Sequence, residues 1–459
     1  MNYKNMDNFY YITGKDLIAL GYTPNKLFGD AIKYINTHEL STEEIKSFLD
    51  EFFKPAPTLE PFKTPVDYIL NIEVENQDEV NNLSAIHNTM QVLMKTPTVL
   101  TGVIMPDACP TGEPGQIPVG GVVVTENAIH PSMHSADVCC SVMTSDLGKI
   151  DPKEVLDIAF VTTHFGAGGR KEHGGWGDLL YDNNYLVEKI LGNYYTKDYI
   201  EKAAKHLGTQ GDGNHFLFVG ISEKTGNTHI VTHHGSRGFG AAVYKKGMDT
   251  AEKYRKELSP NTLKKNAWIP YDSVEGKLYW EALQIVREWT KLNHESLHNR
   301  IINKLKIQYE NRFWNEHNFV FKDGNKFYHA KGATPLEDKF VPDSQNGLRL
   351  IPLNMSQPVL VVKGEATDTN LGFAPHGAGR NVSRAEHHRR HANKTDEQVF
   401  KEETKGLDVR FYTGKIDISE LPSAYKNAES VQRQIEKFGL GTVVDRIMPY
   451  GCIMAGKQE

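Results

Sequence analysis

The chain has 459 residues, of which 24% are charged and 39% hydrophobic, and its formal net charge is −6. These values describe an ordinary globular protein that is long enough for one large core or two smaller ones. The negative net charge argues against a surface that grips nucleic acid through bulk positive charge. Any polyanion would have to be bound at a local basic site.

Residues 1–60 are predicted to form a small helical appendage. Apolar residues recur at helical spacing in Gly14–Gly21 and in Leu27–Ile35. Ser41 followed by Glu44 is a capping pattern that predicts the start of another helix. The proline-rich segment Pro55–Pro61 then has the composition of a linker.

Residues 61–459 are predicted to form a single large α+β domain. A clear helical pattern spans Trp280–Leu305. Short β-type runs bounded by glycine or proline alternate with helical patterns, without a regular βαβ rhythm or an internal repeat. The predicted strands are Thr98–Ile104, Pro118–Val124, Phe216–Val219, His229–Thr232 and Pro358–Lys363.

The cysteines, at positions 109, 139, 140 and 452, do not form a disulfide framework. The N-terminus is polar, with no signal peptide, and no apolar run is long enough to span a bilayer. We therefore predict a cytoplasmic protein without a membrane partner. In that compartment reduced thiols are available as metal ligands.

Five glycine-bounded turns carry side chains that can bind metals or phosphates. One such turn alone is more simply a structural turn, but five together favour a metal-dependent site for phosphoryl or nucleotidyl transfer. Asp, Cys and His suit Zn²⁺, Mn²⁺ or Fe²⁺, and the nearby Lys331, Arg237 and Arg380 could bind phosphates. The turns are Asp137–Cys140, Gly211–Phe216, Thr232–Gly238, Tyr328–Thr334 and Ala374–Arg380.

The last of these turns places His376 among glycines, where it could act as a nucleophile or a metal ligand. A basic run follows it, from Arg384 to His391. This run is a candidate anion site, but its far end is interpreted as a solvated helix face.

The order of these motifs resembles the RtcB family of RNA-splicing ligases, which join a 3′-phosphate or 2′,3′-cyclic phosphate RNA end to a 5′-hydroxyl end. The resemblance spans about residues 98 to 426. The matching residues are Thr101–Asp107, Pro118–Gly121, Asp137 with Cys140, Gly211–Phe216, His233–Gly238, His317–Asn318, His329–Thr334, His376–Arg380 and Pro422–Lys426.

The resemblance implies an RtcB-like fold and a ligase of tRNA splicing or RNA repair that uses two Mn²⁺ ions and GTP. His376 would attack the nucleotide α-phosphate and carry the nucleotide before its transfer to the RNA 3′-phosphate. The implied metal ligands are Asp137, Cys140, His215, His233 and His329. The implied nucleotide contacts are Asn214, Lys331, Gly377, Ala378, Gly379, Arg380 and Tyr425. An activating protein partner stays open.

The departures from the family pattern cluster where the family contacts the base. Phe218 stands where the family has a glutamate that reads guanine, and Val359 replaces a serine. Met454 falls where the family has a lysine, and Pro352–Ser356 replaces a glycine-containing segment. A phenylalanine cannot accept hydrogen bonds from a guanine edge, so the nucleotide used is left open.

Two other classes of function stay open. The altered base contacts fit a metal-dependent enzyme that processes RNA ends, for example by opening cyclic phosphates, without ligating them. A binder of RNA ends that uses its metals structurally is the third possibility, and the presence of both Cys140 and His376 speaks against it.

Overall fold

The computed structural model describes residues 5–6, 9–22, 24, 28–38, 40–53, 58–112, 114–170, 183–344 and 346–457. The chain divides into two compact units, Met1–Leu59 and Glu60–Glu459, which are described separately. Residues 55–57 of the predicted linker lie outside the described residues.

The first unit packs short helices around a small apolar core. Leu17, Ile35 and Leu49 are among its buried residues. The capping pattern is confirmed: Ser41 Oγ accepts from the Glu44 amide at 3.3 Å, and the Ser41 amide donates to the Glu44 carboxylate at 2.8 Å. The elements are β1 (Asn5–Met6), β2 (Phe9–Tyr10), α1 (Gly14–Ala19), α2 (Phe28–Thr37) and α3 (Thr42–Phe52).

The second unit contains an eight-stranded sheet with the order β11-β7-β9-β8-β19-β16-β15, in which β18 also pairs with β19. The long strand β19 pairs antiparallel with β8 and β16 and parallel with β18, so it lies inside the sheet. The strands are β7 (Ser141–Asp146), β8 (Phe216–Ser222), β9 (Thr228–His234), β11 (Asn311–Glu316), β15 (Arg349–Pro352), β16 (Val359–Lys363), β18 (Asp408–Phe411) and β19 (Thr442–Met454).

A second, five-stranded sheet has the order β12-β13-β5-β4-β3. Two small ladders, β14 with β17 and β6 with β10, complete the described strands of this unit. All five predicted strands are confirmed, as parts of β4, β5, β8, β9 and β16. The strands not yet given are β3 (Ile69–Leu70), β4 (Val99–Cys109), β5 (Val119–Glu126), β6 (Ala128–Ile129), β10 (Ile269–Pro270), β12 (Asn318–Asp323), β13 (Lys326–Lys331), β14 (Ala333–Pro335) and β17 (Phe373–Pro375).

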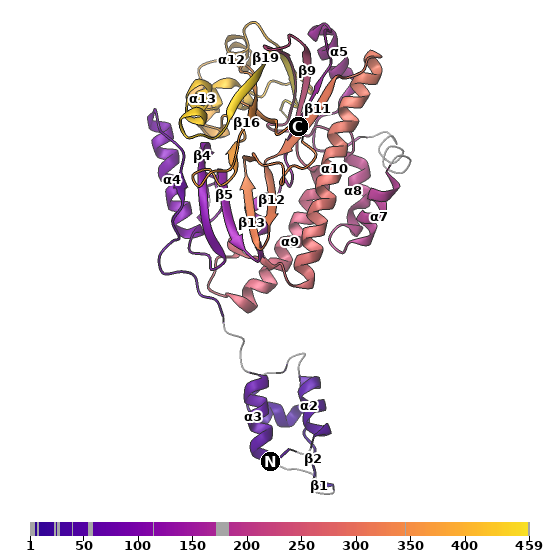
Figure 1. The fold of residues 1–459 in the computed structure, drawn as a ribbon, viewed down its shortest axis with the longest axis vertical. Coiled ribbons are helices and arrows are strands. Elements are labelled where there is room, and N and C mark those ends of the chain that lie inside the picture. The colour runs from indigo at the N-terminus through magenta and orange to yellow at the C-terminus, as the bar shows by residue number, and fades with distance from the viewer. Residues whose placement is uncertain are drawn as a thin grey trace. The chain divides into compact units, whose positions relative to one another are not determined.

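Helices pack against these sheets, which confirms the α+β class. In Figure 1 the long helix α10 runs beside α9, and it also contacts α7 and α5. It starts at Val274, earlier than predicted, because Ser273 caps it by accepting from the Gly276 amide at 2.9 Å. The helices are α4 (Gln77–Leu93), α5 (Pro152–Thr162), α7 (Asn184–Gly192), α8 (Ile200–His206), α9 (Arg237–Leu258), α10 (Val274–Leu305), α11 (Arg384–Arg390), α12 (Asp396–Glu403) and α13 (Ala428–Lys437).

Short 3₁₀ segments connect several of these elements: η1 (Pro131–His134), η2 (Lys197–Tyr199), η3 (Lys264–Asn266), η4 (Ile418–Glu420) and η5 (Pro422–Ala424). Among the described helices, none combines the length and the apolar character that a membrane crossing requires. Even α10 buries polar residues, among them Asn293, His294 and His298.

Four neighbouring strands of the large sheet, β11, β7, β9 and β8, bring chemically active residues to one place. Ser141, the first residue of β7, pairs with Glu316 at the end of β11 and with His234 at the end of β9. Phe216, which begins β8, pairs with His233. The residues just before β7 and β8 and just after β11 are therefore neighbours in space, although the sequence separates them widely.

Candidate active site

A cluster of metal-binding side chains lies at these strand ends. Cys140 and His215 directly precede β7 and β8, His233 lies in β9, and His317 joins β11 to β12. Asp137 comes from the loop before Cys140. The donor atoms form two overlapping groups, one of Asp137, Cys140 and His215 and the other of Cys140, His233 and His317, each with its atoms within 4.8 Å of one another.

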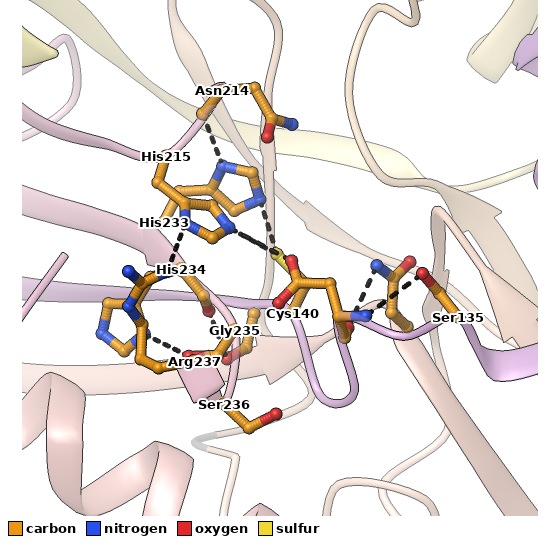
Figure 2. Close-up of polar contacts among 12 residues, drawn as sticks. Ser135, Cys140, Asn214, His215, His233, His234, Gly235, Ser236 and Arg237 are labelled. Carbon is orange, nitrogen blue, oxygen red and sulfur yellow. Dashed lines mark hydrogen bonds and ion pairs between the residues drawn. The ribbon is translucent and has the colours of Figure 1, made fainter. Parts of the chain in front are cut away.

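The Cys140 sulfur is the atom that the two groups share. It lies 3.7 Å from His215 Nε2 and 3.2 Å from His233 Nε2. His215 Nε2 is also 3.1 Å from Asp137 Oδ2, and His233 Nε2 is 3.2 Å from His317 Nε2. Figure 2 shows His215 and His233 directed at the sulfur from the same side. Cys140 would therefore be a ligand common to both donor groups.

The hydrogen bonds around His233 fit a metal ligand. Its Nδ1 lies 3.1 Å from the Asn214 carbonyl oxygen, which can only accept, so Nδ1 carries the proton and Nε2 carries a lone pair. Burial lowers the pKa of His233 to about 3, so the ring is neutral. A ligating histidine with its other nitrogen bonded to a carbonyl is the usual arrangement in metal sites.

The site lowers the pKa of the Asp137 carboxyl and raises the pKa of the Cys140 thiol. Burial favours the neutral acid, but the neighbouring His215 and Arg237 outweigh it and hold the pKa of Asp137 below its usual range. Burial and the Asp137 charge raise the pKa of the Cys140 thiol well above its usual value. A bound divalent cation would reverse this for Cys140, because it favours the thiolate strongly.

A close backbone approach leaves room for the Asp137 carboxylate. A Cβ atom added to Gly235, just after β9, would lie 1.9 Å from Asp137 Oδ1. Only glycine can stand there without displacing the acid. Together, the thiol, imidazoles and carboxylate fit Mn²⁺, Zn²⁺ or Fe²⁺, and the residues present would hold one or two such ions.

His376 lies beside this cluster, in the turn after β17. Its Nδ1 donates to Asp107 Oδ2 at 2.6 Å, and its backbone amide donates to the same oxygen at 3.0 Å. Its ring is 4.8 Å from the ring of His317, centre to centre. Because Asp107 is fully buried and fixes the proton on Nδ1, the lone pair of Nε2 is available for nucleophilic attack.

The turn that carries His376 packs tightly on the strand that carries Asp107. Gly379 has a φ of +74°, and a Cβ atom there would lie 1.9 Å from the Asp107 carbonyl oxygen. A side chain at this position would push the two segments apart. The glycine therefore keeps His376 and Asp107 in contact.

A pocket opens over His376, and its lining has two parts. We call the first part the polar wall; it consists of Asn214, His376, Arg380, Arg384, Glu420 and Tyr425. We call the second part the apolar wall; it consists of Phe216, Phe218, Leu353, Met355, Val359 and Met454. Gly377, Ala378 and Gly379, which separate His376 from Arg380 in the sequence, also line the pocket.

The polar wall is organised around the buried carboxylate of Glu420. It accepts from the Tyr425 hydroxyl at 2.7 Å and from Arg384 Nη2 at 2.7 Å, and Arg380 Nη1 lies 3.4 Å away. Burial and this acid raise the pKa of Tyr425 well above its usual value. The side chains of Arg380 and Tyr425 also stack, with the guanidinium 5.4 Å from the ring centre.

The apolar wall offers the pocket almost no hydrogen-bonding groups. Phe218 and Val359 belong to one apolar cluster, and Met355 and Met454 belong to the next, with Phe216 packed against both. Each of these side chains is satisfied by packing alone. A planar group could bury its face here, but its polar edge would find no side-chain carboxylate on this wall.

Polar residues of α10 form hydrogen bonds with the two strands that carry Cys140 and His233 at or next to their ends. His294 bonds to Thr232 Oγ1 at 2.7 Å and to Ser141 Oγ at 3.0 Å. These two residues directly adjoin His233 and Cys140 in the sequence. His298 continues the network, bonding to Thr232 Oγ1 at 2.8 Å and to Ser145 Oγ at 2.8 Å. The helix thereby fixes the register of the two strands that carry ligands.

One predicted metal ligand requires correction. His329 lies in the middle of β13, where it pairs with Val123 and Val320 in the five-stranded sheet. Its Nε2 accepts from the His130 amide at 2.9 Å, and it belongs to neither donor group. His317 occupies the place assigned to it. The signal in the sequence was the interruption between β11 and β12, where a single residue turns the chain from one sheet into the other.

One predicted nucleotide contact, Lys331, lies outside the pocket lining. Lys331, at the end of β13, is buried and donates to the Ile117 carbonyl at 3.3 Å. Burial lowers its pKa to about 8. It does not line the pocket, although it interacts electrostatically with Cys109, which does. The other predicted contacts, Asn214, Gly377, Ala378, Gly379, Arg380 and Tyr425, do line it.

Sequence reasoning did not assign functions to three further residues. Asp107 orients His376, Glu420 organises the polar wall, and His317 completes the donor groups. Asp107 and His317 lie within motifs noted above, but the sequence alone did not indicate what they contact.

This fold and site define a protein with two overlapping groups of potential metal ligands beside a histidine-containing pocket. The profile of the family described as "tRNA-splicing ligase RtcB" matches residues 182–455. That is more than half of the chain, and the chain belongs to the RtcB family.

Curated relatives named tRNA-splicing ligase RtcB are similar to the chain. The protein of Aeropyrum pernix is 27% identical over 295 residues, which are 54% of this chain and 60% of the relative. That of Thermococcus kodakarensis is 25% identical over 423 residues, which are 76% of this chain and 86% of the relative. That of Archaeoglobus fulgidus is 27% identical over 412 residues, which are 73% and 84%. The chain thus aligns with only part of the first relative and most of the other two.

Proposed function

We propose that this chain is an RNA ligase that joins a 3′-phosphate or 2′,3′-cyclic phosphate RNA end to a 5′-hydroxyl end. Membership of the RtcB family supports RNA ligation as the general activity. The observation that carries the finer proposal is the hydrogen bond from His376 Nδ1 to Asp107, because His376 lines the pocket and lies beside the donor groups around Cys140.

In the proposed reaction His376 Nε2 attacks the α-phosphate of a nucleoside triphosphate. A nitrogen–phosphorus bond forms and pyrophosphate leaves. The nucleotide then passes to the RNA 3′-phosphate, which frees the imidazole, and the 5′-hydroxyl finally displaces the nucleoside monophosphate. The activation step is needed because a phosphate monoester end has no good leaving group.

Each side chain has a distinct role in this scheme. Asp107 keeps the proton on His376 Nδ1 and stabilises positive charge on the ring when the nitrogen–phosphorus bond forms. Arg380 and Arg384 offer cationic groups to phosphates along the polar wall. The donor groups at the strand ends would hold Mn²⁺, whose charge neutralises the phosphate oxygens under attack.

The test is the intact mass of the protein after incubation with Mn²⁺ and each of the four ribonucleoside triphosphates separately. We expect a covalent nucleoside monophosphate adduct on the native chain and none on His376→Ala, with the same metal content in both. GTP is the nucleotide that the family resemblance implies. An adduct that persists in His376→Ala would refute the assigned nucleophile.

A second function, RNA-end processing without ligation, is favoured by one observation. The apolar wall has no carboxylate that could accept from a guanine edge. A chain of this kind would open 2′,3′-cyclic phosphate ends with metal alone. Conversion of such an end in the absence of any nucleotide, without joining to a 5′-hydroxyl RNA, would establish this alternative.

Cytoplasmic location stays a prediction from the sequence, and a role in tRNA splicing or RNA repair stays a prediction from the resemblance. Which RNA the protein joins and whether it needs an activating protein stay open. Joining assays with purified protein alone test the need for an activator.

A further inference from the structure

A second group of metal-binding side chains lies outside the site described above, where α11 and α12 meet. His387 lies in α11, His391 directly follows this helix, and Glu403 is the last residue of α12. One donor atom of each lies within 4.8 Å of the others. The far end of the run Arg384–His391 was interpreted as a solvated helix face, and Arg389 and Arg390 are exposed, whereas His387, earlier in the run, is only 1% exposed.

The spacing of the two histidines would allow both to bind the same metal ion. Residues four apart on a helix face the same side, and the rings of His387 and His391 lie 4.4 Å apart, centre to centre. Two imidazoles and one carboxylate form a donor set that proteins use for Zn²⁺. Tetrahedral ligands about 2.1 Å from Zn²⁺ are roughly 3.4 Å from each other. The distance between His391 Nε2 and Glu403 Oε1 is 3.7 Å.

The tautomer of His391 suits a metal ligand. Its Nδ1 donates to the His387 carbonyl at 2.9 Å, so in the neutral ring Nε2 carries a lone pair. That lone pair faces the carboxylate of Glu403, which is also an acceptor. Two acceptors that face each other repel unless a proton or a metal ion lies between them. The carbonyl-bonded Nδ1 is again the usual arrangement of a metal-ligating histidine.

His387 can supply the third ligand after a change of tautomer. The Ser423 hydroxyl donates to Glu403 Oε1 at 2.7 Å, so it accepts from His387 Nε2 at 2.8 Å. His387 Nδ1 has no hydrogen-bond partner among the described residues. Moving the proton from Nε2 to Nδ1 would free Nε2 for a metal, and the bond to the metal would replace the hydrogen bond to Ser423.

The helix ends favour positive charge at this place. The cluster lies at the C-terminal ends of both α11 and α12. Helix C-termini carry partial negative charge from their free carbonyl groups, which attracts cations.

We propose that His387, His391 and Glu403 form a zinc-type site, separate from the donor groups around Cys140. The ion would join α11 to α12 next to η5, where Ser423 lies. Arg384 of α11 and Tyr425, which follows η5, both line the polar wall. The site would therefore stabilise the back of the pocket structurally, and it does not depend on the proposed reaction.

The experiment is a measurement of zinc content in the full chain. Metal-stripped protein is loaded with Zn²⁺, passed through gel filtration and measured by elemental mass spectrometry. His391→Ala and Glu403→Gln should each contain one equivalent less than the native chain. His388 is exposed on the same helix, so His388→Ala is the matched control and should keep the full content.

The same comparison in a Cys140→Ser background separates the two sites. One equivalent should remain in Cys140→Ser and disappear when His391→Ala is added. Far-UV circular dichroism and gel filtration establish that each variant is folded. Equal zinc content in folded native, His391→Ala and Glu403→Gln proteins would overturn the proposal, as would a Cys140→Ser protein that binds no zinc.

Discussion

The polar and apolar walls of the same pocket are built on different principles. Every charged group of the polar wall is held by a hydrogen-bonded partner. Glu420 pairs with Arg380 and Arg384. His376 is held by Asp107, which lies outside the wall. The apolar wall is fixed only by packing. Geometry that depends on directed bonds tolerates little change, whereas a packed surface accepts other side chains of similar volume. Substitutions in the apolar wall can therefore change which ligand the pocket prefers, while the hydrogen-bonded groups of the polar wall stay in place.

The largest effect is expected from the atom on which both donor groups depend. Cys140→Ala removes the ligand that the two groups share, so bound Mn²⁺ should be lost and nucleotide labelling abolished. Metal content and adduct mass measure this. The adjacent, equally buried Cys139 lies in neither group, so Cys139→Ala should keep both properties. Full labelling by Cys140→Ala would contradict the role of the cluster.

Asp107→Asn should reduce the rate of labelling by about 10²- to 10⁴-fold, because the amide no longer stabilises the charged ring of His376. Metal content should not change, since Asp107 belongs to neither donor group. Single-turnover labelling measures the rate. A variant that labels at the native rate would show that the pair is only structural.

Acid should weaken the fold through buried imidazoles whose pKa is lowered by burial, such as that of His134 in η1. Burial lowers the pKa of His134 from 6.5 to about 4. Its folded pKa lies below the unfolded one, so its contribution is complete above pH 6.5 and is lost as the pH falls towards 4. At pH 5 the loss from one such group is about 2 kcal/mol.

The measurement is the free energy of unfolding at pH 7 and pH 5. His134→Gln should lose about 2 kcal/mol less than the native chain between these two values. The exposed His388 provides the control, because His388→Gln should lose as much as the native chain. An identical loss in His134→Gln would mean that this ring is not buried neutral.

The smallest effect concerns the apolar wall. A site that hydrogen-bonds its ligand rejects analogues by about 10⁴-fold, whereas packing alone discriminates far less. We expect labelling efficiencies for the four ribonucleoside triphosphates to differ by less than about tenfold. Competition between pairs of nucleotides, read by adduct mass, measures this. A strong preference for one base would show that backbone groups read its edge.

The sequence predicted five of the strands, and it named most residues that the structure brings together at the candidate site. Short β-type runs bounded by glycine or proline predicted these strands, because such a run is a pattern that a single segment carries. Asp137, Cys140 and His215 were assigned as metal ligands because the motifs that contain them resemble those of the RtcB family. A single segment cannot show which sheet it joins. The wrong assignment of His329 as a metal ligand arose for this reason.

His329 and His317 illustrate this limit. Both are buried histidines, His329 within β13 and His317 between β11 and β12, and their immediate sequences do not separate them. The pairing of β13 with β5 directs His329 towards His130, while the step from β11 to β12 delivers His317 to the cluster. The same limit applies to His387 and His391, whose partner Glu403 comes from another helix.

The position of β19 within the large sheet has a consequence for the synthesis of this protein. Thr442–Met454 pairs with both β8 and β16, and Met454 also forms part of the apolar wall. The ribosome makes this strand after every metal ligand and after His376. Until it emerges, β8 and β16 present open edges, which are prone to pair with other chains. A stalled or shortened chain would thus be a candidate for aggregation, and the pocket can close only when translation has passed residue 454.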